Sequence, residues 1–211
     1  MKNSHVWNKL SESGIVAVMR NMTSETVIET VSALKSAGIT AIEITVENEE
    51  GMEAVSTVKK HFKDDVLLGA GTVLDGVTAK NAIDLGVDFI VTPVVSIEAI
   101  QVAKRYGCFI GVGAMTPTEV LTAYEAGADI VKIFPASNLG PTYLKNIKGP
   151  LHHIPLMPTG GINLNNLADF VKNGAECIGV GGALYKYDTV EEIKKVAKEF
   201  KQEYINSISI D

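Results

Sequence analysis

Lys132 lies within an otherwise apolar run of β-branched and aromatic residues, Ile130-Val131-Lys132-Ile133-Phe134-Pro135. The run has the length of a buried strand and is closed by a proline. A lysine there must find a counter-charge or lose its proton, because a buried ammonium is costly in a low-dielectric interior. A neutral lysine is a nucleophile that forms Schiff bases with carbonyl substrates. Lys132 is therefore a candidate catalytic amine; a structural ion pair or a side chain that reaches water is the alternative.

Polar residues recur near the ends of other apolar runs: Arg20, Glu43 with Thr45, Thr72, Thr92 and Thr159. Side chains alternate along a strand, so Lys132 and Phe134 share one face, as do Glu43 and Thr45. An amine that forms an adduct needs a carboxylate to move protons, and Glu43 would supply it. A Glu–Lys pair that only fills the interior is the alternative. Buried ion pairs stabilise proteins poorly compared with apolar packing, so we favour catalysis.

Two glycine-rich segments, Thr159-Gly160-Gly161 and Gly179-Val180-Gly181-Gly182, each lie between a predicted strand and a predicted helix. Glycines let backbone N–H groups approach an anion closely, and a following helix N-terminus adds a positive dipole end. The two segments therefore predict a phosphate site. Glycine used only for the conformation of a tight turn is the alternative.

Short apolar runs alternate with helical patterns along the whole chain. The predicted strands are 15–20, 41–46, 67–73, 89–93, 109–114, 130–136, 156–161 and 177–182, and the predicted helices are 24–37, 50–62, 77–85, 97–106, 117–126, 141–147, 164–173 and 190–204. Ser24 and Thr116 are predicted N-caps. Eight strand–helix units predict a (β/α)8 TIM barrel. A doubly wound open sheet is the competitor, but the first strand–helix turn, residues 20–23, lacks glycine.

We expect residues 1–211 to form this single barrel domain, with a short helix around Val6-Trp7-Leu10 that covers its bottom. Strands 2 and 6 lie opposite each other in an eight-stranded barrel, so Glu43 and Lys132 would meet near its axis. Catalytic groups of such barrels come from the carboxyl ends of the strands, where all the candidate residues fall.

The composition, 46% hydrophobic with a net charge of −6, is that of a globular protein and argues against nucleic acid or a membrane as partner. Cys108 and Cys177 open predicted buried strands, so we expect reduced core residues of a cytoplasmic protein. No Cys or His has metal-ligand spacing, so neither a metal nor another cofactor is expected.

Residues 128–136, with Lys132 at their centre, resemble the Schiff-base lysine motif of the 2-keto-3-deoxy-6-phosphogluconate (KDPG) and 4-hydroxy-2-oxoglutarate (KHG) aldolases. Residues 38–45 resemble the family's glutamate motif. Gly69-Ala70-Gly71-Thr72-Val73, Thr92-Pro93, Gly160-Gly161 and Gly179-Val180-Gly181 match as well. The similarity runs from about Gly14 to Leu184. It implies a class I aldolase that releases pyruvate from a small 2-oxo acid, with Lys132 as nucleophile and Glu43 as acid/base, working as a homotrimer.

Two positions depart from the family pattern. Glu47 replaces an arginine that grips the substrate carboxylate, and Gly182 replaces a serine in the phosphate loop. We therefore expect Arg20 to bind the carboxylate with help from Thr72, and Glu47 to turn into solvent. Pro93 and Phe134 would form an apolar surface beside the reacting carbons and exclude water from them. A phosphosugar isomerase or epimerase, and a barrel that only binds a sugar phosphate, remain the alternative functions.

Overall fold

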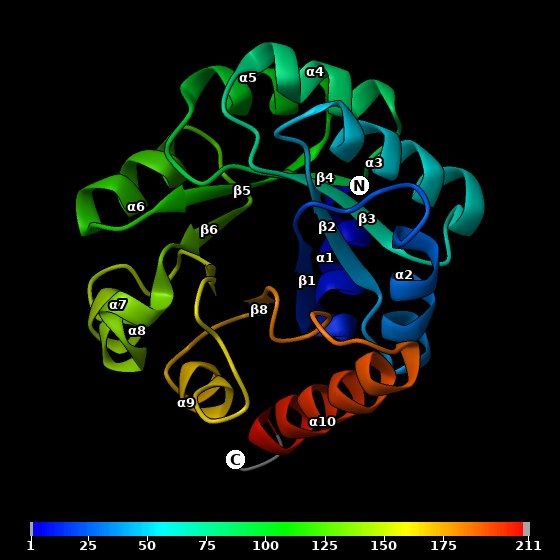
Figure 1. Ribbon diagram of the computed structural model, residues 1–211. Helices are drawn as coiled ribbons and strands as arrows, with labels where there is room; N and C mark the ends of the chain where they lie inside the picture. Colours follow the sequence, from blue (N-terminus) through cyan, green and yellow to red (C-terminus); the bar gives the residue numbers. More distant parts are fainter. Residues whose placement is uncertain (1, 209–211) are drawn as a thin grey trace.

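The strands close into an almost complete barrel in the computed structural model, which describes residues 2–208 (Figure 1). The eight parallel strands are β1 Ile15–Met19, β2 Ala41–Thr45, β3 Leu67–Gly71, β4 Phe89–Val91, β5 Phe109–Ala114, β6 Ile130–Ile133, β7 Leu156–Pro158 and β8 Ile178–Val180. Each strand from β1 to β6 pairs with its successor, and β8 pairs with β1. An isolated bridge between Thr159 and Gly179 joins the two ends of the sheet. The predicted barrel is confirmed.

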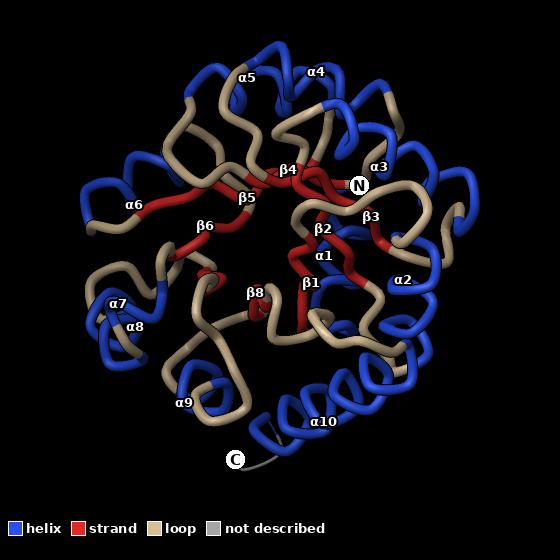
Figure 2. Tube along the Cα trace, in the orientation of Figure 1, coloured by secondary structure: helices blue, strands red, loops and turns tan. Residues whose placement is uncertain are grey.

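Helices surround the strands on the outside, as the ring of strands in Figure 2 makes clear. They are α2 Val27–Ser36, α3 Glu49–Phe62, α4 Gly76–Asp84, α5 Ile97–Tyr106, α6 Pro117–Glu125, α7 Ala136–Leu139, α8 Pro141–Lys148, α9 Leu167–Lys172 and α10 Val190–Ile208, preceded by α1 Lys2–Ser13. None of these helices combines the length and the apolar character that crossing a bilayer requires.

One predicted N-cap is right and the other is wrong. Thr116 caps α6 in a full capping box with Glu119. Ser24 instead lies in a turn before α2, where the Thr26 N–H donates to the Thr23 hydroxyl at 3.4 Å. The helix therefore starts at Val27, three residues later than predicted.

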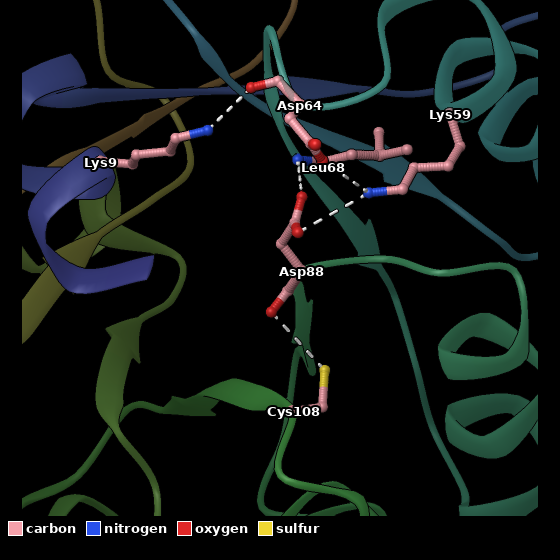
Figure 3. Close-up of polar contacts among 6 residues, drawn as sticks. All are labelled: Lys9, Lys59, Asp64, Leu68, Asp88 and Cys108. Atoms are coloured by element: carbon pink, nitrogen blue, oxygen red, sulfur yellow. Dashed lines mark hydrogen bonds and ion pairs between the residues drawn. The ribbon is translucent and has the colours of Figure 1, made fainter. Parts of the chain in front are cut away.

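Helix α1 packs across the amino-terminal ends of the strands. Its Val6 and Leu10 join a buried cluster with inward-facing strand residues, and its Trp7 ring lies 6.0 Å from the Phe109 ring. Figure 3 shows polar contacts that support this end. Lys9 of α1 donates to the Asp64 carbonyl at 2.8 Å, and the Asp88 carboxylate accepts from the Leu68 N–H at 2.9 Å. Helix α1 thus covers the barrel at this end.

Glycines on the inner face make room for large or polar neighbours. A Cβ on Gly69 would lie 2.2 Å from the Phe89 ring, and a Cβ on Gly71 would lie 2.0 Å from Glu43 Oε1. In the strand register Glu43 pairs with Gly69, and Lys132 pairs with Gly113. Each candidate catalytic residue thus has a glycine beside it on the neighbouring strand, and Gly71 leaves the space that the Glu43 carboxyl group occupies.

Both cysteines, Cys108 and Cys177, are buried and neither forms a disulfide, as expected of core residues. Burial raises the pKa of the Cys177 thiol to about 12. This thiol is therefore protonated at neutral pH and behaves as an apolar side chain.

Candidate active site

A cavity of about 250 Å³ opens at the carboxyl ends of the strands. Its lining includes the eleven residues expected to be catalytic or to bind substrate: Arg20, Glu43, Thr72, Pro93, Lys132, Phe134, Thr159, Gly160, Gly161, Gly181 and Gly182. The polar residues Thr45 and Thr92 are not part of the lining. Val18, Ile162 and Ala183 complete the wall. The strand topology thus brings these eleven residues together in space, although they are spread over most of the chain.

Glu43, on β2, presents a buried carboxyl group to this cavity. The residue has no solvent exposure, and neither carboxyl oxygen has a hydrogen-bond partner among the residues that the structure describes. Burial raises the pKa of Glu43, and the nearby charges of Lys132 and Arg20 only partly oppose that effect. A carboxyl group with a raised pKa that faces a cavity is suited to accepting and returning a proton.

Lys132, on β6, is 4% exposed and points into the same cavity. Its Nζ atom lies 5.0 Å from the centre of the Phe134 ring. No ion pair fixes the Lys132 amine among residues 2–208, so it is free to react with a carbonyl carbon. The inward positions of Glu43 and Lys132 follow the parity expected from strand alternation.

Pro93 and Phe134 form the apolar wall near the amine. The Thr92 hydroxyl accepts a hydrogen bond from the Gly113 N–H at 3.2 Å and donates one to the Val94 carbonyl at 2.7 Å. These bonds fix the turn that carries Pro93. A Cβ on Gly113 would lie 2.1 Å from the Pro93 carbonyl carbon, so only glycine lets this turn approach the strand.

Arg20 lies at the mouth of the cavity, but its surroundings differ from the prediction. Its Nη1 forms an ion pair with Glu47, and its Nη2 lies 3.5 Å from the Thr72 hydroxyl. The expectation that Glu47 turns away into solvent is therefore wrong. An unpaired guanidinium attracts the nearest carboxylate, and Glu47 follows β2 closely enough to reach it. Thr72 itself adopts a left-handed conformation with φ of 58°, a strained state for a β-branched residue and one typical of functional sites.

The glycine loops, residues 159–162 and 181–183, face each other across the far end of the cavity. Among the described residues, the N–H groups of Gly161, Ile162, Gly182 and Ala183 donate to no other protein atom. Helix α10 begins at Val190, as predicted, whereas an asparagine turn, with Asn166 bonded to the Gly161 carbonyl, delays α9 from the predicted residue 164 to Leu167. Neither helix begins directly at its glycine loop. Free backbone amides, rather than helix dipoles, are what these loops offer an anion.

Lys186 is a residue that the sequence analysis missed. Residues 182–186 form a helical turn, with the Lys186 N–H bonded to the Gly182 carbonyl at 3.0 Å. Side chains of a helical turn lean toward its N-terminal end, so the Lys186 stem lies over Gly182, where Cδ would be 2.8 Å from an added Cβ. The i to i+4 spacing from the glycine could have indicated this contact. The lysine occupies the space of the side chain that Gly182 lacks.

A sequence model of the KDPG and KHG aldolase family matches residues 6–199. The 2-dehydro-3-deoxy-6-phosphogalactonate aldolase of Escherichia coli (strain K12) is 33% identical over 196 residues, which cover 92% of this chain and 96% of that protein. The 2-dehydro-3-deoxy-phosphogluconate aldolase of Pseudomonas aeruginosa is 32% identical over 180 residues, covering 84% and 81% of the two chains.

Solved structures show the same likeness. The native KDPGal structure superposes with a TM-score of 0.89 at 33% identity, covering 93% of this chain and 96% of that one. The 4-hydroxy-2-oxoglutarate aldolase/2-deydro-3-deoxyphosphogluconate aldolase from TTHB1 gives a TM-score of 0.86 at 28% identity, covering 94% and 98%.

Proposed function

This chain belongs to the KDPG and KHG aldolase family, and on that premise we propose that it is a class I aldolase that cleaves a 2-keto-3-deoxy-6-phospho sugar acid through a Schiff base on Lys132. The observation that carries the proposal is the single cavity shared by Lys132, the buried Glu43 carboxyl group and the free amides of the glycine loops. An amine, a proton carrier and an anion site are the three parts that this reaction needs.

In the proposed reaction the neutral Lys132 amine adds to the C2 ketone, and loss of water gives an iminium. Glu43 removes the proton of the C4 hydroxyl, directly or through water, and the C3–C4 bond breaks. Its electron pair moves toward the iminium nitrogen, so an aldehyde leaves and the enamine of pyruvate remains. Protonation at C3 and hydrolysis of the imine then release pyruvate and restore the lysine. Pro93 and Phe134 keep bulk water from the enamine.

The two ends of the substrate have separate binding groups in this proposal. Arg20 and Thr72, which form the carboxylate subsite, hold C1. The glycine loops and the Lys186 ammonium hold the phosphate, so the expected aldehyde product is glyceraldehyde 3-phosphate. A shorter substrate such as 4-hydroxy-2-oxoglutarate, which yields pyruvate and glyoxylate, would leave the glycine loops unused and bind more weakly.

Borohydride trapping tests the proposal. Incubation with pyruvate and borohydride should attach one reduced three-carbon group per chain, and peptide mapping should place it on Lys132. Lys132→Met should abolish both the adduct and aldol cleavage, whereas Lys172→Met, on the exposed surface of α9, should retain both. A wild-type protein that is never trapped would refute the Schiff base. Interconversion of a sugar phosphate without cleavage would favour the isomerase, and binding without turnover would favour the non-catalytic barrel.

We also propose that the protein works in the cytoplasm as a homotrimer of one-domain subunits. Apolar side chains are exposed where α4 and α5 begin: Leu74 57%, Val77 72%, Val94 53% and Ile97 44%. Leu74 and this end of α5 are linked by a hydrogen bond from the Ser96 hydroxyl to the Leu74 carbonyl. Such a patch is suited to an interface between copies of the chain. Light scattering would measure the mass, and a monomer would refute the proposal.

A further inference from the structure

The ion pair between Arg20 and Glu47 occupies the carboxylate subsite at the mouth of the cavity. Arg20 Nη1 is bonded to Glu47, whereas Nη2 faces Thr72. A guanidinium grips a carboxylate best with two parallel N–H donors. While Nη1 holds Glu47, a substrate carboxylate at the Nη1–Nη2 edge would have to share Nη1 with Glu47.

Glu47 is placed so that only its side chain has to move. On one side of it the Val46 N–H donates to the Gly71 carbonyl at 3.0 Å, and on the other Asn48 caps α3 by accepting from the Gly51 N–H at 3.0 Å. The backbone at Glu47 is thus held at both ends. Its side chain is 37% exposed, so a carboxylate that leaves Arg20 regains water at small cost.

We infer that Glu47 is a further residue of the binding site that competes with the substrate carboxylate for Arg20. In the free enzyme the Glu47 carboxylate stands in for the substrate, and binding of a 2-oxo acid displaces it toward solvent. The displacement makes every 2-oxo acid bind more weakly than Arg20 alone would allow. The loss is shared by substrate and product. It therefore promotes the release of pyruvate, which has only its carboxylate, while the contacts of the glycine loops with the phosphate keep the phosphorylated acid bound. This inference rests on the proposed function.

Glu47→Gln tests the inference, because it keeps the shape of the side chain and removes its charge. KM for the phosphorylated acid, and the pyruvate concentration that gives half-maximal trapping on Lys132, should both fall about two- to fivefold, the range set by an exposed ion pair. The turnover number should change little, because Glu47 does not touch the reacting carbons. Glu50→Gln, an equal charge change on the exposed first turn of α3, should alter neither value.

A double-mutant cycle with Arg20→Ala separates competition for Arg20 from a general charge effect. Arg20→Ala alone should raise KM about ten- to hundredfold, the range of a charge-assisted hydrogen bond. In that background Glu47→Gln should no longer lower KM. An unchanged or higher KM for Glu47→Gln in the wild-type background would overturn the inference, and so would a decrease that persists without Arg20. Failure of the aldolase proposal looks different, because no variant would then form an adduct on Lys132.

Discussion

Replacement of Glu43 by glutamine should remove activity and yet stabilise the fold. Glu43 has no solvent exposure, its carboxyl oxygens have no hydrogen-bond partner among residues 2–208, and burial raises its pKa above the ordinary 4.5. The folded protein therefore carries a carboxyl group that is costly to ionise. Glutamine has nearly the same shape and cannot ionise, so Glu43→Gln removes that cost together with the ability to carry a proton.

The stabilisation should depend on pH in a defined direction. Because the folded pKa is raised, the wild-type protein has no penalty below the pKa of the unfolded chain and loses stability as the pH rises through the folded pKa. Glu43→Gln has no ionisable group at this position and therefore lacks this pH-dependent loss of stability. The Tm of the variant relative to that of the wild type should therefore be higher at neutral pH than at pH 4.5.

Thermal unfolding followed by circular dichroism between pH 4.5 and 8 measures this difference, with Glu50→Gln as the exposed control. In steady-state assays Glu43→Gln should lower the turnover number about 10²–10⁴-fold, the usual contribution of a positioned proton carrier. Trapping of pyruvate on Lys132 should persist. Near-normal turnover would refute the role of Glu43 in proton transfer. A variant that is less stable than wild type at every pH would refute the account of its burial.

Three further results are expected. Gly71→Ala places a Cβ 2.0 Å from Glu43 Oε1 and should lower turnover roughly 100-fold by displacing that carboxyl group. The control Gly149→Ala, at a helix end far from Glu43, should not lower turnover. Equal turnover of the two variants would contradict this expectation. Lys186→Gln should raise KM for the phosphorylated acid about two- to fivefold and leave KM for 4-hydroxy-2-oxoglutarate unchanged, with Lys172→Gln as control; an equal change for both acids would remove Lys186 from the phosphate site. A strong chelator should leave turnover unchanged, because no cluster of metal ligands exists among residues 2–208; loss of activity restored by a divalent ion would contradict the Schiff-base mechanism.

The barrel could be predicted from the sequence because its signals are local and repeat eight times. Most strands begin where their apolar runs begin, but several end earlier than predicted. The run at Ile130 was expected to continue to residue 136, and the strand ends at Ile133. At the carboxyl ends, residues such as Phe134 and Thr159 leave the sheet to line the cavity, so apolar character continues past the last strand pairing. Short helix α7 was missed because four residues carry no periodic pattern.

Inward-facing side chains could also be predicted, since strand parity and strand order fix which way Glu43 and Lys132 point. The contacts of Arg20, Glu47 and Lys186 could not, because these long side chains leave from strand ends and loops. Their partners depend on rotamers and on turns that no periodicity describes. The sequence identified Glu47 as unusual, but only the structure shows that it pairs with Arg20.

The closing seam of the barrel lies under the glycine loops. Among residues 2–208, the three-residue strands β7 and β8 are linked by the bridge from Thr159 to Gly179 and by two hydrogen bonds of Glu176. Its N–H donates to the Leu156 carbonyl at 3.0 Å, and its carboxylate accepts from the Leu156 N–H at 2.6 Å. Few backbone bonds must break for the seam to open, so its amides should exchange with deuterium sooner than those between β2 and β3. A phosphate held by both loops, as proposed, would link the two sides of the seam. The substrate would then act as a removable crosslink, and its binding should slow exchange across the barrel wall itself as well as in the loops that touch it.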